Sequence, residues 1–113
     1  MVRNVEAWGA LMAGETFEID RATDVSMTEL LDRLDAAADR LARVARRVRD
    51  HDAWDETWTD TLDDPPREKP FGTAIAHVIT HSMHHRAQVI AMLRRLGVEG
   101  VPEGDVFSWE KGT

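Results

Sequence analysis

The longest helical pattern in the sequence covers residues 26–49. Ser26 is placed to cap this helix, and Glu29, three residues later, completes a capping box. Apolar residues then recur at spacings of three and four: Leu30, Leu34, Ala37, Leu41, Val44 and Val48. They form one stripe on a helix whose other faces carry arginines, and such a stripe has to be buried against other helices. The pattern therefore predicts a helix bundle.

Two further segments have helical spacing. Residues 3–13 carry three apolar side chains on one face: Val5, Trp8 and Met12. Residues 73–96 end at Gly97, a residue type that favours a helix C-terminus. The expected fold class is all-α, with three main helices in one domain, residues 1–113. A bundle of four helices is the more usual closed arrangement, so we expect either that the chain dimerises or that a helix is missing from its N-terminus.

The remaining segments are predicted to be irregular. Residues 51–72 are rich in acids, threonines and prolines, so we expect a loop there, and no strand-like alternation is apparent. The tail, residues 97–113, contains turn-forming residues, and we expect Phe107 and Trp109 to pack it down into a structured end.

The composition excludes several classes of function. The chain has 113 residues, a net charge of −7 and no cysteine. The acidic balance argues against a nucleic-acid partner, and the absence of cysteine excludes thiolate nucleophiles, thiolate metal ligands and disulfides. No segment approaches the roughly 20 apolar residues that span a bilayer, and the N-terminus has no signal-peptide pattern. We therefore expect a cytoplasmic protein with no membrane partner.

Four of the five histidines lie within nine residues on the last predicted helix: His77, His81, His84 and His85. His81 and His85 are four residues apart, so their side chains are neighbours on the helix and can ligate one metal ion. Catalytic metal sites usually have three protein ligands, so this pair needs a third from elsewhere. The alternative interpretation is an ordinary helix that carries histidines on its surface.

Two charged residues near these patterns also need an interpretation. Arg86 falls close to the centre of the apolar face of the last helix, where a guanidinium requires a partner. We expect a structural ion pair for Arg86, with Glu6 as one candidate partner, rather than a substrate clamp. His51 follows the helix over residues 26–49 and is expected to interact with its C-terminal dipole.

The segment "HVITHSMHHRAQVIAMLRRLGV" resembles the last helix of the DinB/YfiT-like family. The family pattern reads roughly H-x-x-x-H-x-x-H-H-R-x-Q, which falls here on the four clustered histidines, Arg86 and Gln88. The segments "VPEGD" and "NVEAWGALMAG" are similar to the family's tail and to the end of its second helix.

The resemblance implies that the three main helices belong to an up-down four-helix bundle, with a divalent metal held by three histidines. Two of these match His81 and His85, and the third usually lies upstream of the position of Trp8. No residue of this chain matches the third ligand, and we expect the family's first helix to be missing. Zinc, nickel and iron all suit histidine ligands.

Family members with a known function are metal-dependent thiol S-transferases or are described as metal-dependent hydrolases. The resemblance therefore implies one of these two activities, on an unknown small-molecule substrate. The rival hypothesis is a metal-free, non-catalytic helical interaction module. In both cases we expect a homodimer, because three helices leave an apolar face for a second copy to cover.

Overall fold

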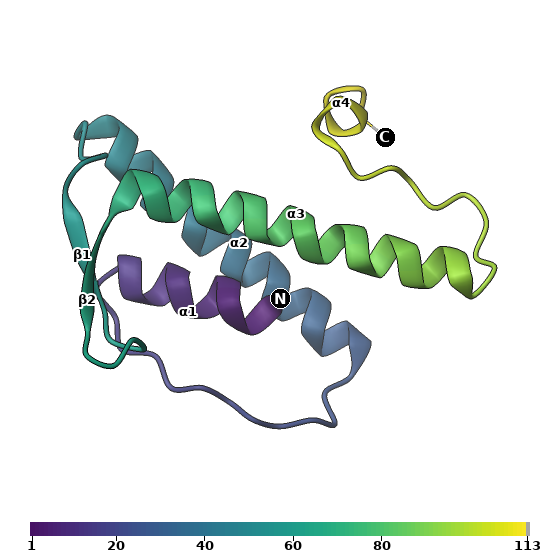
Figure 1. The fold of residues 1–113 in the computed structure, drawn as a ribbon, viewed down its shortest axis with the longest axis horizontal. Coiled ribbons are helices and arrows are strands. Elements are labelled where there is room, and N and C mark those ends of the chain that lie inside the picture. The colour runs from purple at the N-terminus through teal and green to yellow at the C-terminus, as the bar shows by residue number, and fades with distance from the viewer. Residues whose placement is uncertain (113) are drawn as a thin grey trace. The chain divides into compact units, whose positions relative to one another are not determined.

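The structure is a computed structural model that describes residues 1–112. It divides into two compact units, Met1–Val78 and the chain from Ile79 onward, which are described separately below. The elements in chain order are α1 (Val2–Met12), α2 (Met27–Asp50), β1 (Thr57–Asp60), β2 (Arg67–Pro70), α3 (Phe71–Arg95) and α4 (Val106–Glu110) (Figure 1). Three main helices confirm the expected helical-bundle class. No helix within residues 1–112 is long and apolar enough to cross a membrane.

In the first unit, α1 packs against α2, and the two helices run in the same direction. Glu6, in the first half of α1, contacts Arg33 in the first half of α2, and the carbonyl of Met12 at the end of α1 contacts Arg47 near the end of α2. The connection over residues 13–26 makes this possible, because it returns the chain to the level where α1 began (Figure 1). The Oγ of Ser26 then accepts a hydrogen bond from the Glu29 backbone N–H at 3.1 Å, which is the predicted N-cap.

The core of the first unit draws on both helices, the hairpin and the start of α3. Met12 and Val48 are each only 1% exposed, and Trp58 of β1 and Ile75 of α3 belong to the same buried cluster. Full burial of one such apolar side chain contributes about 1.5–3 kcal/mol to the free energy of folding. The stripe predicted on residues 26–49 therefore does face the core, with Ala37, Val44 and Val48 as its buried members.

A two-residue fork joins the N-terminal halves of α1 and α2. Arg33 donates Nε–H to one carboxylate oxygen of Glu6 at 2.7 Å and Nη2–H to the other at 2.8 Å. Both side chains are about four-fifths shielded from solvent. The hydrogen bond that Arg33 donates to Glu6 is the largest influence on its guanidinium and raises the pKa of that group. Bidentate pairs of this kind fix orientation, so the fork sets the register of α1 on α2.

The prediction of a loop over residues 51–72 was wrong in one respect. β1 and β2 form an antiparallel hairpin in which Trp58 pairs with Lys69 and Asp60 with Arg67. Trp58 and Asp60 point inward, whereas Thr57 and Thr59 are exposed. The alternation is too short to stand out among acids and prolines, and it includes a buried aspartate that reads as a loop residue.

Asp60 is buried because the second strand supplies its partner. Its carboxylate accepts a hydrogen bond from Lys69 Nζ at 2.6 Å and another from the Leu62 backbone N–H at 3.1 Å. Lys69 Nζ also lies 2.9 Å from Asp63. The hydrogen bond to Asp60 is the largest cause of a raised pKa of the Lys69 ammonium. The charges of Asp60, Lys69 and Asp63 therefore stabilise the hairpin at a position where an apolar side chain would usually be buried.

In the second unit, the tail folds back onto α3. Arg86 Nη1 donates to the carbonyl oxygen of Gly104 at 2.9 Å, and Arg94 forms an ion pair with Glu103 at 3.0 Å. Asp105 caps α4 by accepting from the Ser108 backbone N–H at 2.7 Å, and this hydrogen bond lowers the pKa of the Asp105 carboxyl.

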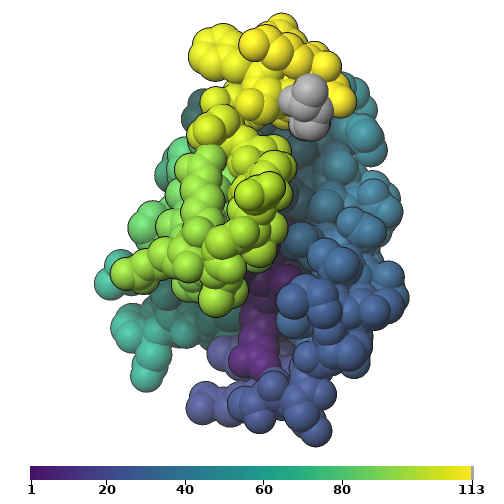
Figure 2. All heavy atoms as spheres, turned by 90° about the vertical axis from the view of Figure 1, so that its right-hand side faces the viewer, coloured from purple at the N-terminus to yellow at the C-terminus, as the bar shows by residue number. Residues whose placement is uncertain are grey.

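The expectation that Phe107 and Trp109 pack down was wrong. They are 73% and 78% exposed, respectively, and Figure 2 shows side chains of this C-terminal segment, in yellow, at the surface. The hydrogen bonds that attach the tail to α3 run instead to the Glu103 side chain and the Gly104 carbonyl oxygen.

Because the pKa of Lys69 is raised, the free energy of unfolding should depend on pH in the alkaline range. A raised pKa stabilises the fold below the ordinary value of about 10.5, and this contribution is lost as the pH rises through the folded-state pKa. Lys69→Met should lower the free energy of unfolding at about pH 8 by about 1–2 kcal/mol, since Asp60 loses a charged partner that is itself partly exposed. Because the chain has no tyrosine or cysteine, urea unfolding between about pH 8 and about pH 11.5 reports mainly on its lysines.

Lys111→Met is the matched control, because it removes the same charge from an exposed position. The wild type and this control should lose more stability over the alkaline range than Lys69→Met. An equal loss in all three proteins would mean that the Asp60–Lys69 pair does not stabilise the hairpin.

Gly104 provides a second prediction. It has a φ of +71°, and a Cβ at this position would lie 2.9 Å from both Arg86 Cδ and Ile90 Cδ1. Gly100 has a similar φ of +69° but nothing within 4 Å of its Cβ position. Both Gly→Ala changes strain the backbone equally, so the difference between them isolates the packing of the tail.

We expect Gly104→Ala to weaken tail attachment by about 0.5–1.5 kcal/mol more than Gly100→Ala, because side chains must leave their preferred rotamers. Amide hydrogen exchange in α4 measures this, and it should be faster in Gly104→Ala by about a factor of five. Equal exchange in the two variants would show that the tail is not packed at Gly104.

Candidate metal centre

The candidate centre lies on α3, where the helix brings His81 and His85 together. Their four-residue spacing places the rings on adjacent turns, with ring centroids 4.6 Å apart and planes at 71°. The Nε2 atoms of the two rings are 2.9 Å apart, and both side chains are half-buried. The two nitrogens therefore converge on one region beside the helix.

Gln88 orients one of these rings. Its Oε1 lies 2.9 Å from Nδ1 of His85 and, because a carbonyl oxygen only accepts, Nδ1 carries the proton. When His85 is neutral, its Nε2 then presents a lone pair, which accepts from Nε2–H of His81. Histidines that ligate metals are commonly held in this way, with the other ring nitrogen donating to an oxygen.

The separation of the two nitrogens matches the requirements of a metal ion. Two metal–nitrogen bonds of about 2.0–2.1 Å place the nitrogens about 2.9 Å apart at a right angle and about 3.4 Å apart at a tetrahedral angle. The observed 2.9 Å suits adjacent ligands in an octahedral arrangement, and a small rotation of either ring reaches the tetrahedral value. The donor pair therefore fits a divalent ion.

The pair is not a full ligand set. Within residues 1–112, no group of three or more His, Asp or Glu side chains is arranged to hold a metal ion. The identification of His81 and His85 as metal ligands, with a third ligand not identifiable, stays a prediction.

The other histidines have separate surroundings. In the first unit, His77 is exposed and makes an edge-to-face contact with Trp8, with ring centroids 5.0 Å apart. His84 is exposed next to His85, with ring centroids 5.7 Å apart. His51 Nδ1 donates to the Arg47 carbonyl at 2.8 Å and forms the C-cap of α2, the place expected from its position in the sequence.

Arg86 is exposed, and its hydrogen bond runs to the carbonyl oxygen of Gly104 rather than to a carboxylate. The carboxylate of Glu6, which was considered as its partner, is bound by Arg33 in the first unit. An ion pair of Arg86 stays a prediction, while its contact with the tail is a second role that helical periodicity alone does not reveal.

Gln88 is the residue whose role the sequence pattern did not reveal. In the sequence it stands only as the last position of the histidine-rich motif. Its position three residues after His85 places it on the next turn of the same face, so this spacing was the available signal.

The comparisons with known proteins agree with the helical organisation. The sequence pattern of the DinB family matches residues 1–109. No curated protein and no solved structure gives a significant match. The DinB family is often metal-binding, and the matched region includes the whole of α3 with its histidines. Because the match extends over nearly the whole chain, this protein belongs to the DinB family.

Proposed function

We propose that His81 and His85 supply two ligands of a divalent-metal site, with zinc, nickel or iron as the ion. The observation that carries this proposal is the 2.9 Å separation of the two Nε2 atoms, which fits two bonds to one ion. Membership of an often metal-binding family supports it.

Three residues of α3 would have distinct roles in this site. His81 and His85 would hold the ion through Nε2, with the His81 proton moved to its Nδ1, and Gln88 would keep the His85 ring in the orientation that directs Nε2 toward His81. Both histidines stand on the same rigid helix, so little conformational entropy is lost when they bind. The third ligand would come from outside this pair.

The proposed chemistry is hydrolysis or thiol S-transfer on a small-molecule substrate. A divalent ion at this position would supply Lewis acidity that activates a water molecule or a thiol at neutral pH. The thiol would have to belong to the substrate, because the chain contains no cysteine. We place this activity in the cytoplasm, with no nucleic-acid or membrane partner, in keeping with the net charge of −7.

Metal binding by α3 is tested by a Zn²⁺ titration followed by calorimetry and by elemental analysis of the dialysed protein. The wild type should retain about one ion per site, and His81→Ala/His85→Ala should lose at least tenfold in affinity because both nitrogen donors are gone. His84→Ala is the matched control, since this exposed histidine is adjacent in sequence but its Nε2 is not part of the pair.

Equal zinc affinity in the wild type and the double variant would refute the site. An equal loss in His84→Ala and the double variant would also count against it, since it would indicate a diffuse histidine surface. Circular dichroism of each variant confirms that α3 is still folded.

The alternative function is a metal-free, non-catalytic homodimeric interaction module. It is supported by the apolar side chains that α3 exposes, which include Ile79 at 54%, Val89 at 48% and Leu96 at 79%. Exposed apolar residues on one helix face are typical of contacts with another chain. Homodimer formation is compatible with metal binding, so the titration separates the two functions.

Dimer formation is tested at Val89. Val89→Glu introduces a charge on the apolar face and should shift a dimer toward monomer by at least tenfold in dissociation constant. Ala91→Glu is the control, because residue 91 is exposed and lies nearly opposite residue 89 on the helix. Sedimentation velocity at micromolar concentration measures both. A wild type that sediments as a monomer, or an equal effect of the two variants, would contradict the proposal.

A further inference from the structure

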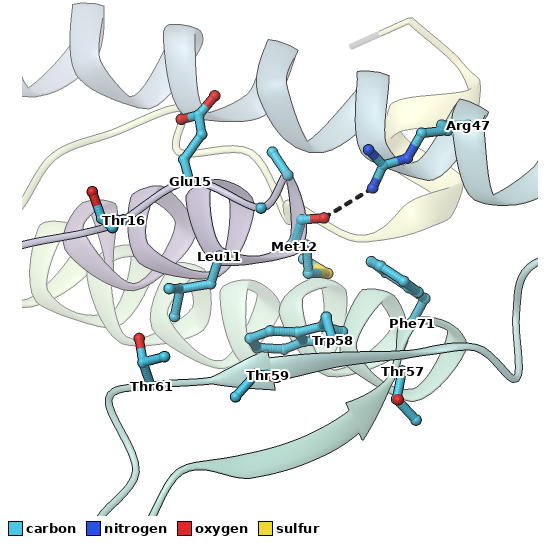
Figure 3. Close-up of a pocket in the computed structure, with 12 residues that line it drawn as sticks. Leu11, Met12, Glu15, Thr16, Arg47, Thr57, Trp58, Thr59, Thr61 and Phe71 are labelled. Atoms are coloured by element: carbon cyan, nitrogen blue, oxygen red, sulfur yellow. Dashed lines mark hydrogen bonds between the residues drawn. The ribbon is translucent and has the colours of Figure 1, made fainter.

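A cavity of about 490 Å³ lies in the first unit, where the C-terminal end of α1 meets β1 and the start of α3 (Figure 3). All of its lining residues belong to Met1–Val78, so it is formed within this unit alone. Its volume is within the range of small-molecule sites, about 300–1,000 Å³. It shares no residue with the histidine pair, which belongs to the second unit.

The walls combine apolar surface with hydroxyl groups. Leu11, Met12, Trp58 and Phe71 provide the apolar part, and Figure 3 shows their side chains gathered between α1 and β1. Thr16 and Thr61 add hydroxyl groups at its border, whereas the hydroxyls of Thr57 and Thr59 bond to Glu68 on the outer face of the hairpin. An apolar pocket with a few polar groups at its border suits a ligand with a flat or aliphatic body and one polar end.

Arg47 places a positive charge at the border of the cavity. Its Nη2 donates to the Met12 carbonyl at 2.9 Å, and its guanidinium carbon lies 5.8 Å from the centroid of the Phe71 ring. Within residues 1–112, no carboxylate lies within ion-pair distance of Arg47. A guanidinium has five N–H donors, so this anchored side chain retains donors for a carboxylate at the cavity border.

The surroundings of Arg47 reinforce its positive potential. An adjoining cavity of about 230 Å³ shares Ala13, Glu15 and Arg47 with the first and is also lined by Arg40 and Arg43. Glu15 is neutralised by Arg40 at 3.3 Å. Three arginines against one glutamate make this region locally cationic, in a chain whose net charge is −7. An anion is therefore attracted here.

The wall also contains an unsatisfied donor. Trp58 is 6% exposed, and its indole Nε1–H has no hydrogen-bond acceptor in the part of the chain that the structure describes. A buried donor without an acceptor costs about 1–3 kcal/mol.

We propose that this cavity binds a small amphipathic carboxylate, with the apolar body against Met12, Trp58 and Phe71 and the carboxylate on Arg47. The inference does not depend on the metal site, because it uses residues of the first unit only.

The experiment uses 1-naphthaleneacetate as the probe and its neutral amide, 1-naphthaleneacetamide, as the matched control ligand. Binding to the wild-type protein is followed in ¹H–¹⁵N correlation spectra, in which each of the four tryptophans contributes one indole signal. The acid should shift the Trp58 signal, and the amide should bind about tenfold more weakly because it lacks the charge. Trp109, which is 78% exposed, reports non-specific binding.

Arg47→Gln should weaken binding of the acid about tenfold, whereas Arg46→Gln should change it less than twofold. Both arginines are exposed on α2, but only Arg47 lines the cavity. If Arg47→Gln does not fold, the comparison of acid and amide on the wild type still decides. An unchanged Trp58 signal at millimolar acid, equal binding of acid and amide, or a shift confined to Trp109 would overturn the proposal.

Discussion

The packing of α1 against α2 is the contact on which the first unit depends. A helix as short as Val2–Met12 is only marginally stable alone, so it needs the stripe of α2 to remain folded. The fork between Glu6 and Arg33 sets its register at one end, and the Arg47 hydrogen bond to the Met12 carbonyl holds the other. The hairpin and the start of α3 then cover the same core, which leaves the cavity beside Met12.

The histidine pair depends on a different constraint, the period of one helix. Residues four apart on α3 have to lie on adjacent turns, so His81 and His85 are brought together without help from any other element. Gln88 joins them through the same period. A third ligand has no such local rule, because it must come from another segment or another chain. This difference explains why two donors are well defined in the structure while the ligand set is not.

Contacts within one helix could be predicted from the sequence, whereas contacts between distant segments could not. Periodicity predicted the three main helices, the Ser26 cap and the pairing of His81 with His85, all of which depend on neighbours within one helix. The hairpin was missed because a buried Asp60 makes sense only once Lys69 lies on the adjacent strand. Whether Trp109 is buried, and whether a cavity forms at Arg47, also depend on how distant segments pack together. A pattern along the chain does not contain that information.

The central claim is that His81 and His85 bind one ion through their Nε2 atoms. Long-range ¹H–¹⁵N correlation spectra of the histidine rings, recorded with and without an equimolar amount of Zn²⁺, test it most directly. The geometry predicts that Nε2 of both rings changes to the metal-bound form, while Nδ1 of His85 keeps its proton for Gln88. Unchanged rings, or binding of the ion through Nδ1 of His85, would contradict the claim.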